Sequence, residues 1–323
     1  MSEGTLFVDE VSAGLRQVEE RLAAELAEER PELREVTSHL FRAGGKRLRP
    51  ALVLTCAQTG NAAEPGVMTV AVACELIHMA TLVHDDVIDE AEIRRGRPTV
   101  NARWGDHISV LAGDYFFARA FSLLGSTGVN RVVRMMADVV FHMCAGEIEQ
   151  NLSRWDPVGQ SEERYLDRVG KKTALFIAQC CRAGALMAGA PDEVSEALYR
   201  YGYGIGMGFQ IIDDLLDLNA TQVFGKAIGS DLRSGVYTIP VIHALGDAAH
   251  RVRLLELTGN RSPQNPEIEE VRSILGEAGS FEYAQALARR YVDEAVAALE
   301  PLGTSTTARQ LRLLAAYVLE RQL

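Results

Sequence analysis

Cysteine is scarce in this sequence, and its spacing gives no sign of a metal centre. The five cysteines lie at positions 56, 74, 144, 180 and 181, and no CxxC or Cys/His pattern connects them. An odd number without such spacing argues against a disulfide framework and against a zinc site of the usual type. We therefore expect reduced thiols and a cytoplasmic protein.

An excess of basic residues is also lacking. The formal net charge is -11 and the isoelectric point is near 5.2. Because an acidic surface repels a phosphate backbone, this balance excludes broad nucleic-acid binding. Any anion that binds must do so at a local cluster of basic side chains.

The first 22 residues lack a basic segment followed by an apolar core, which is the pattern of a secretory leader. No later stretch is expected to stay apolar long enough to cross a bilayer. The sequence thus predicts a protein without a transmembrane segment.

Alternating strand patterns are nearly absent, whereas apolar residues recur at helical spacing along almost the whole chain. The main runs cover roughly 8–29, 47–59, 65–92, 105–125, 129–152, 162–188, 194–218, 236–249, 267–275, 281–299 and 305–322. The breaks between them are short, and no linker, repeat or low-complexity tract interrupts the chain. This pattern predicts an all-α protein, built as a single large helical bundle over residues 1–323.

Three aspartates stand at the end of the apolar segment LIHMATLVHDDVID. In a helix, Asp85 and Asp89 share a face, because positions i and i+4 are about 40° apart, and Asp86 lies at the edge of that face. A solvated acidic face is the plainer interpretation, but the preceding turns are apolar. Buried like charges need a cation, and a cluster of carboxylate oxygens suits Mg²⁺.

Arginines follow directly in the segment RRGRPT, where Gly96 and Pro98 are expected to end the helix. The guanidinium groups of Arg94 and Arg95 are suited to bidentate phosphate binding. Their alternative role is pairing with the nearby aspartates or with Glu92. Phosphate binding and pairing with carboxylates can both occur, at different stages of the reaction.

A second acidic turn, FQIIDDLLD, repeats the arrangement at Asp213, Asp214 and Asp217. Two such turns far apart in sequence meet only through tertiary folding, where they could hold metal ions between them. A diphosphate bridged by such ions is a good leaving group. Gln210 lies on the same face, and basic residues flank the clusters in three segments: Lys46, Arg47 and Arg49; Lys171 and Lys172, followed by Thr173; and Lys226. Singly, each is an ordinary surface residue; their number is what points to an anion.

Five segments, in this order, resemble the trans-isoprenyl diphosphate synthases, also called the polyprenyl synthetase family: GGKRLRP, LVHDDVIDEAEIRRGRPT, KKTALF, GFQIIDDLLD and GKAIGSDL. The segment ELIHMATLVHDDVID also resembles the corresponding sequence of the large catalytic component of heptaprenyl diphosphate synthases. These enzymes need a small partner subunit. The motifs span residues 44–240, and the helical pattern extends the similarity over nearly the whole chain.

The resemblance implies one all-α domain around a deep central cavity, in an enzyme that condenses isopentenyl diphosphate with an allylic diphosphate, farnesyl or geranylgeranyl diphosphate. It implies a homodimer, or a heteromer with a small regulatory subunit. A cytoplasmic enzyme peripheral to the membrane that receives its product fits this role.

The resemblance also assigns residues. About three Mg²⁺ ions would bind Asp85, Asp86, Asp89, Asp213, Asp214 and Asp217. The allylic diphosphate would also contact Arg94, Lys172 and Lys226, while the metal-free diphosphate of isopentenyl diphosphate would bind Lys46, Arg49, Arg95 and His78. Taken alone, His78 would be interpreted as a core histidine. Thr173 and Gln210 would stabilise an allylic carbocation with their oxygen dipoles.

One position departs from the family pattern. Relatives commonly read GK.T.P after the second cluster, whereas this chain reads GVYTIP, with Val236 in place of a lysine. Loss of one cation should weaken the hold on a diphosphate. Because both aspartate clusters and the other basic residues are present, an active enzyme is still expected.

Product length is predicted from the residues four and five positions before Asp85, which lie about 6 to 7.5 Å deeper along the helix. They are Thr81 and Ala80. In this family, bulky aromatic side chains there stop growth early, so small ones imply a product of C30 to C50. The helical wheel favours Thr81, which lies directly beneath Asp85, and Ala80 is alternatively plain helix filler. A short-chain farnesyl or geranylgeranyl synthase is the alternative.

Three other functions fit less well. A terpene cyclase also uses a DDxxD helix, but its second metal motif normally mixes Asn or Asp, Ser or Thr, and Glu, unlike DDLLD. A non-catalytic partner subunit usually loses aspartates, and none is lost here. The segment YGYGIGMG fails the dinucleotide-binding pattern GxGxxG and follows no strand, so its glycines are expected to allow close helix packing.

Overall fold

The computed structural model describes residues 9–27, 30–219, 228–259 and 263–320. Helices make up nearly all of these residues, and the strands among them are the two short segments β1 (Ile93–Arg94) and β2 (Arg97–Pro98). The predicted all-α class is confirmed. The chain divides into two compact units: unit 1 comprises Met1–Ala137, Gln179–Leu198 and Thr304–Gln310, and unit 2 comprises Asp138–Ala178, Tyr199–Gly303 and Leu311–Leu323.

Most helices belong to one unit. Unit 1 holds α1 (Asp9–Glu25), α2 (Pro31–Arg42), α3 (Leu48–Ala57), α4 (Pro65–Ile88), α5 (Val100–Trp104) and α6 (Asp106–Ser126). Unit 2 holds α8 (Glu162–Val169), the π-helical turn η2 (Gly170–Ala174), α11 (Ser230–Arg233), α12 (Ile239–Leu245), α13 (Ala248–Thr258), α14 (Asn265–Glu277), α15 (Ser280–Ala297) and the 3₁₀ turn η3 (Glu300–Leu302). The unit limits fall inside the remaining helices, α7 (Asn130–Leu152), α9 (Leu175–Met187), α10 (Asp192–Asn219) and α16 (Thr306–Glu320).

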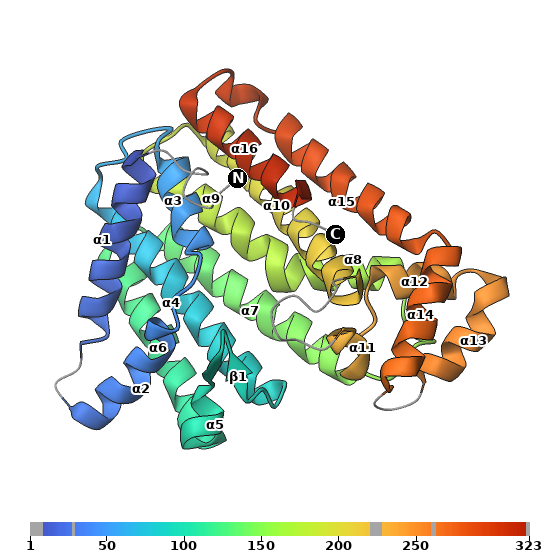
Figure 1. Cartoon of the computed structure of the whole chain (residues 1–323). Coiled ribbons are helices and arrows are strands. Elements are labelled where there is room, and N and C mark those ends of the chain that lie inside the picture. Colours follow the sequence, from blue (N-terminus) through green and yellow to red (C-terminus); the bar gives the residue numbers. More distant parts are fainter. Residues whose placement is uncertain (1–8, 28–29, 220–227, 260–262, 321–323) are drawn as a thin grey trace. The chain divides into compact units, whose positions relative to one another are not determined.

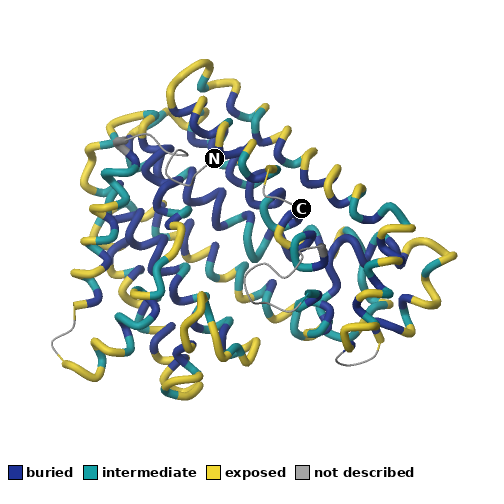
Figure 2. The backbone as a smooth tube through the Cα atoms, in the orientation of Figure 1, coloured by how far each residue is buried: buried dark blue, intermediate teal, exposed yellow. Residues whose placement is uncertain are grey.

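The core of unit 1 forms around α4, which packs against α3 and α6 (Figure 1). Eight of the ten residues of α3 are buried, and α4 is buried over most of its length (Figure 2). A helix that is apolar on all sides is stable only when neighbouring helices cover it. The aspartate cluster at the end of α4 is therefore anchored by a buried helix.

By length and composition, two helices could cross a membrane. The expectation that no stretch of the chain is long and apolar enough was therefore wrong. The two helices are α4 and α6. In α4, 72% of the most apolar 18-residue stretch is buried inside the protein, as in the core helix of a soluble protein, and in α6 the share is 33%. Length and composition alone are weak evidence for a membrane span.

Unit 2 is built on a second apolar core, to which α8, α10, α12, α14 and α15 contribute. Here the glycines of YGYGIGMG lie at close helix contacts: a Cβ at Gly204 would come within 2.6 Å of the Tyr291 carbonyl oxygen, and one at Gly206 within 2.5 Å of the Ala174 Cα. A Cβ at Gly208 would come within 2.6 Å of Val292. The prediction that these glycines serve helix packing is confirmed.

The end of α4 differs from the prediction. The helix ends at Ile88, with Asp89 as its C-cap, and not at Gly96. Residues 93–98 instead form a two-stranded hairpin in which Arg94 pairs with Arg97. Arg95 and Gly96 form its turn with φ of 52° and 73°, and positive φ at both central positions matches the twist of a hairpin. The arginine run thus belongs to a rigid hairpin rather than to a helix end.

Candidate active site

The first aspartate cluster lies at the C-terminal end of α4, in unit 1. Asp85 is half-buried, Asp89 is exposed, and Asp86 is only 1% exposed. Nε of Arg94 donates a hydrogen bond of 2.7 Å to Oδ1 of Asp86. Burial raises the pKa of Asp86, and Arg94 opposes that rise. The predicted pairing of the arginine run with the aspartates is therefore present at Arg94.

The backbone around this cluster is fixed by side chains that follow the hairpin. Asn101 Nδ2 donates to the carbonyl oxygens of Asp86 and Ala91 at 3.3 and 3.1 Å. The Thr99 hydroxyl donates to the Ala91 carbonyl at 2.7 Å. These bonds tie the segment after the hairpin to the last turn of α4 and to Ala91, which follows it.

Basic side chains of unit 1 gather around His78, seven residues before Asp85 on α4. Burial and the positive charges of four arginines lower the pKa of His78 well below its usual value of 6.5; in order of effect they are Arg49, Arg95, Arg94 and Arg47. Charges that act on one imidazole lie close to one another. In a protein of net charge -11, these residues are a local concentration of positive charge.

Arg47 holds the loop that presents Lys46 and Arg49. Its side chain is buried between two carboxylates, with Nε 2.5 Å from Glu19 and Nη1 2.7 Å from Glu75. Its backbone has a φ of 49°, a left-handed value that is uncommon outside glycine. Arg47 is thus engaged inside the protein, whereas Lys46 is exposed and Arg49 is half-buried.

The loop before α3 also contacts the hairpin turn. A Cβ built at Gly45 would lie 2.7 Å from Nη1 of Arg95, so a larger residue there would displace this guanidinium. The contact brings the segment GGKRLRP against RRGRP. Sequence spacing predicted a role for both segments but not this contact.

The second aspartate cluster lies on α10, in unit 2. Asp214 is buried and accepts two hydrogen bonds, from the Tyr165 hydroxyl at 2.6 Å and from Gln210 Nε2 at 2.8 Å. Burial raises the pKa of Asp214 to about 7, although both hydrogen bonds and the positive charge of Arg168 oppose the rise. The Thr173 hydroxyl donates to Gln210 Oε1 at 2.9 Å. Thr173, Gln210 and Asp214 therefore form one hydrogen-bonded chain.

The other two aspartates of this cluster differ in exposure. Asp213 is exposed, and Asp217 is half-buried. Asp217 accepts the backbone N–H groups of Ser230 and Asp231 at 3.2 and 3.1 Å, and also the Ser230 hydroxyl. Its carboxylate caps the start of α11, which fixes the segment following the second cluster.

Lys172 and Thr173 lie in the π-helical turn η2, where the N–H of Leu175 bonds to the carbonyl of Gly170. Turns of this kind are frequent at functional sites because they shift side chains out of helical register. Lys172 Nζ pairs with the Glu147 carboxylate and donates to Gln150 Oε1 at 3.1 Å. Lys171 instead binds Glu149 and Asp167 at the surface.

The predicted site residues thus fall into two half-sites. Unit 1 holds Lys46, Arg49, His78, Asp85, Asp86, Asp89, Arg94 and Arg95, and unit 2 holds Lys172, Thr173, Gln210, Asp213, Asp214 and Asp217. Lys226 lies outside the described residues. Within the described part of the chain, no three His, Cys, Asp or Glu side chains are already gathered to hold a metal ion. The donor set nevertheless suits a hard divalent cation, since each half-site offers carboxylate oxygens, one of them buried.

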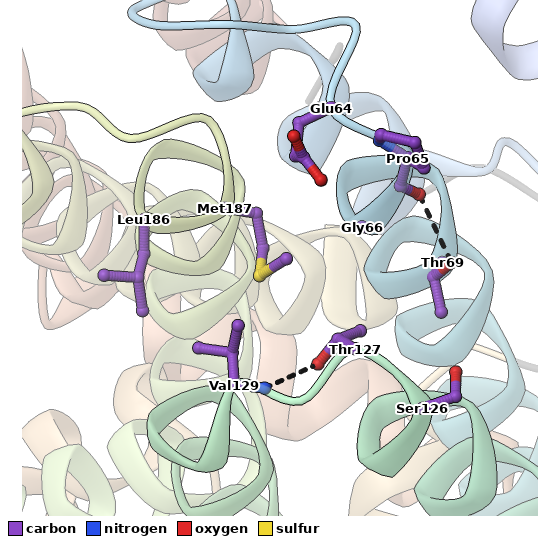
Figure 3. A pocket seen from close by; sticks show the side chains of 9 residues that line it. All are labelled: Glu64, Pro65, Gly66, Thr69, Ser126, Thr127, Val129, Leu186 and Met187. Atoms are coloured by element: carbon purple, nitrogen blue, oxygen red, sulfur yellow. Dashed lines mark hydrogen bonds between the residues drawn. The ribbon is translucent and has the colours of Figure 1, made fainter.

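A cavity of about 390 Å³ lies elsewhere in unit 1 (Figure 3). It is lined by the start of α4 at Gly66, the end of α6 at Ser126 and the end of α9 at Met187. Gly66 and Asp85 are on the same helix, about 28 Å apart at 1.5 Å per residue. The cavity is therefore remote from the first aspartate cluster of the same unit.

Sequence patterns missed several residues that shape the half-sites. Tyr165 and Arg168 on α8 lie beside Asp214, and Glu75 and Glu147 hold Arg47 and Lys172. None stands in a recognisable motif. Only the position of Tyr165, seven residues before Lys172, would have suggested a shared helical face, and the π-helical turn disturbs that register.

Comparisons with known proteins identify the family of this chain. The family model for polyprenyl synthetase matches residues 30–275. The chain is 41% identical to heptaprenyl diphosphate synthase component 2 of Geobacillus stearothermophilus, covering 96% of this chain and 97% of the relative. It is 36% identical to geranylgeranyl diphosphate synthase of Methanosarcina mazei, covering 98% of both. The crystal structure of a decaprenyl diphosphate synthase from Rhodobacter capsulatus matches with a TM-score of 0.90 and 36% identity, over 96% of this chain and 97% of that one. The chain belongs to the polyprenyl synthetase family.

Proposed function

We propose that this chain condenses isopentenyl diphosphate with farnesyl or geranylgeranyl diphosphate, and that its all-trans product has 30 to 50 carbons. The observation that carries the proposal is the position of the hairpin, where Arg94 pairs with the buried Asp86 and Arg95 lies against Gly45. The guanidinium of Arg95, together with Lys46 and Arg49, fits a diphosphate bound without metal. The neighbouring carboxylates of Asp85, Asp86 and Asp89 fit a second diphosphate bound through cations.

The basic cluster would bind isopentenyl diphosphate. Lys46, Arg49 and Arg95 supply positive charge, and the neutral imidazole of His78 can donate one hydrogen bond to a phosphate oxygen. Arg94 and Lys172 would contact the allylic diphosphate, as would Lys226. Arg94 and Lys172 are paired with Asp86 and Glu147, and these ion pairs would hold them in place before substrate binds.

Mg²⁺ would be held by the six aspartates, with three ions expected from the family resemblance. Bound there, the ions would neutralise the negative charge of the departing diphosphate. Asp86 and Asp214 are pre-oriented for this role by Arg94 and by Tyr165 with Gln210. Asp85, Asp89 and Asp213 are more exposed, so they can turn toward an arriving ion and its substrate.

The reaction requires no side-chain nucleophile. The bond between the allylic carbon and oxygen breaks, and its electron pair leaves with the diphosphate. The double bond of isopentenyl diphosphate attacks the allylic cation and forms the new carbon–carbon bond, and the resulting cation loses a proton to the released diphosphate. The Thr173 hydroxyl points its hydrogen at Gln210, which leaves the negative end of its dipole available to the cation.

The predicted product length rests on small residues and on the named relatives. Ala80 is fully buried, and Thr81 is half-buried with its hydroxyl bonded to the His78 carbonyl. Relatives include heptaprenyl and nonaprenyl synthases as well as geranylgeranyl synthases. The heptaprenyl synthase relative is named component 2. A complex with a small partner subunit is therefore the second candidate assembly, beside a homodimer.

The test is elongation by the purified chain. The protein is incubated with Mg²⁺, labelled isopentenyl diphosphate and farnesyl or geranylgeranyl diphosphate, and products are sized after dephosphorylation. We expect C30 to C50 products from the wild-type chain. Asp86→Ala should abolish elongation. The control Glu92→Gln changes a charge next to the hairpin and should retain elongation. The absence of elongation with any primer, alone or with a candidate small subunit, would refute the activity. A dominant C15 or C20 product would refute only the predicted length.

A further inference from the structure

Arg168 is a buried cation for which the proposed reaction has no role so far. It lies on α8 and is only 7% exposed. Its Nη2 donates a hydrogen bond of 2.8 Å to the carbonyl oxygen of Tyr237, and its guanidinium faces the Tyr165 ring at 5.6 Å from the centroid. A buried guanidinium is costly unless opposite charges lie near it.

Opposite charges do surround Arg168, and they belong to the second half-site. Attraction to Asp214 on α10, Asp231 on α11 and Glu147 on α7 favours its charged form. The effect is reciprocal, because Arg168 in turn favours the ionised form of Asp214. Tyr165 joins the two groups: its hydroxyl bonds to Asp214, and its ring lies under the guanidinium.

Arg168 is also tied to the backbone of the segment that follows α11. The carbonyl that it binds belongs to Tyr237, the residue after Val236. The Val236 N–H bonds to the Asp231 carbonyl at 2.8 Å, and the Tyr237 hydroxyl bonds to the Thr258 carbonyl at 2.8 Å. The segment is thus held firmly beside a fixed positive charge, although its own side chain at position 236 is apolar.

We propose that Arg168 is a positioning residue that holds Asp214, through Tyr165, for cation and diphosphate binding. The inference rests on the proposed function, since it concerns the same diphosphate. A charge inside the protein is weakened less by solvent screening than a charge at the surface.

The experiment compares Arg168→Met, which keeps the length of the side chain and removes its charge, with Arg164→Met, which removes an exposed charge from the same helix. Calorimetry measures binding of inorganic diphosphate in the presence of Mg²⁺, and elongation assays give the Mg²⁺ concentration for half-maximal rate and both KM values. We expect Arg168→Met to weaken diphosphate binding about tenfold and to raise the allylic KM more than the isopentenyl KM. Arg164→Met should change none of these.

Arg168→Lys tests the role of the charge, because it keeps a positive group beside Tyr165. It should retain most of the diphosphate affinity, within about threefold of wild type. A loss as large as that of Arg168→Met in a folded Arg168→Lys variant would overturn positioning by the buried charge. A lower melting temperature for Arg168→Met with unchanged Mg²⁺ dependence would show a merely structural role. Wild-type chain that binds diphosphate but does not elongate would contradict the proposed function and leave this inference standing.

Discussion

The Nε atom of Arg94 lies 2.7 Å from Oδ1 of Asp86, so the first arginine after the acidic cluster neutralises the buried aspartate of that cluster. Before a cation binds, this ion pair offsets part of the cost of burying Asp86. Under the proposed function, cations held by the cluster would take over this role, and the Arg94 guanidinium would become available to phosphate. The two roles considered for the arginine run, ion pairing and phosphate binding, therefore suit successive states.

Arg94→Met should affect both stability and substrate binding. Without its partner, the buried carboxylate of Asp86 loses a charged hydrogen bond, so the free energy of unfolding should fall by about 1 to 3 kcal/mol. The KM for the allylic diphosphate should rise about tenfold, because one charged contact is worth roughly that factor. Urea unfolding and steady-state kinetics measure the two effects.

Arg97→Met is the matched control for that variant, since Arg97 pairs with Arg94 in the hairpin but is exposed. It should leave both quantities near the wild-type values. Equal effects of the two substitutions would mean that the hairpin, and not the Arg94–Asp86 pair, is responsible.

His78 should make the ligand-free protein less stable in mild acid. Its pKa is far below 6.5 in the folded chain, because of burial and of Arg49, Arg95, Arg94 and Arg47, and returns to about 6.5 on unfolding. Below pH 6.5 the unfolded state binds more protons, so stability falls as pH falls, by up to about 1.4 kcal/mol per pH unit. The stability contributed by the neutral imidazole is fully present above pH 6.5.

His78→Asn should therefore flatten the dependence of the free energy of unfolding on pH between about 5 and 6.5. Denaturant titrations at several pH values, without diphosphate, measure the slope for wild type and variant. His107→Asn, at an exposed histidine, should keep the wild-type slope. An unchanged slope in His78→Asn would show that His78 is already protonated in the folded chain.

Ala80→Phe should shorten the product while turnover stays measurable. Ala80 is fully buried on α4 five residues before Asp85, and a phenyl ring there would fill space that a growing tail would need. Thr81→Phe provides the comparison, because Thr81 lies directly beneath Asp85 on the helical wheel. Product sizing decides between them: shortening by Thr81→Phe alone would place the floor on that face, and no shortening by either would place it elsewhere.

Gly206→Ala should destabilise unit 2 by about 1 to 3 kcal/mol, because its Cβ would come within 2.5 Å of the Ala174 Cα and the backbone would have to shift. Ala174 ends the π-helical turn that carries Lys172 and Thr173, so turnover should fall as well. Gly276→Ala on α14 meets no atom within 4 Å and should stabilise the chain by about 0.5 to 1 kcal/mol. Equal melting temperatures for the two variants would contradict the packing role of Gly206.

Local patterns predicted much of the fold and the site. The helical runs 65–92 and 129–152 correspond to α4 and α7, and the two DDxxD turns lie on α4 and α10 as expected. The hairpin at 93–98 was missed because two-residue strands leave no alternating pattern, and Gly96 and Pro98 were interpreted as a helix end. The prediction of a single domain over residues 1–323 and that of a cytoplasmic location both stay predictions.

The sequence by itself determined the helical class, the two acidic turns and the kind of chemistry that carboxylates and guanidinium groups can support, because these follow from residue type and short-range spacing. Tertiary structure alone decided which aspartates are buried, that Arg94 pairs with Asp86, and that Tyr165 and Arg168 lie beside Asp214. The physical reason is that burial and charge pairing depend on neighbours distant in the chain. A motif specifies an aspartate, but the packing around it sets its charge and its partner.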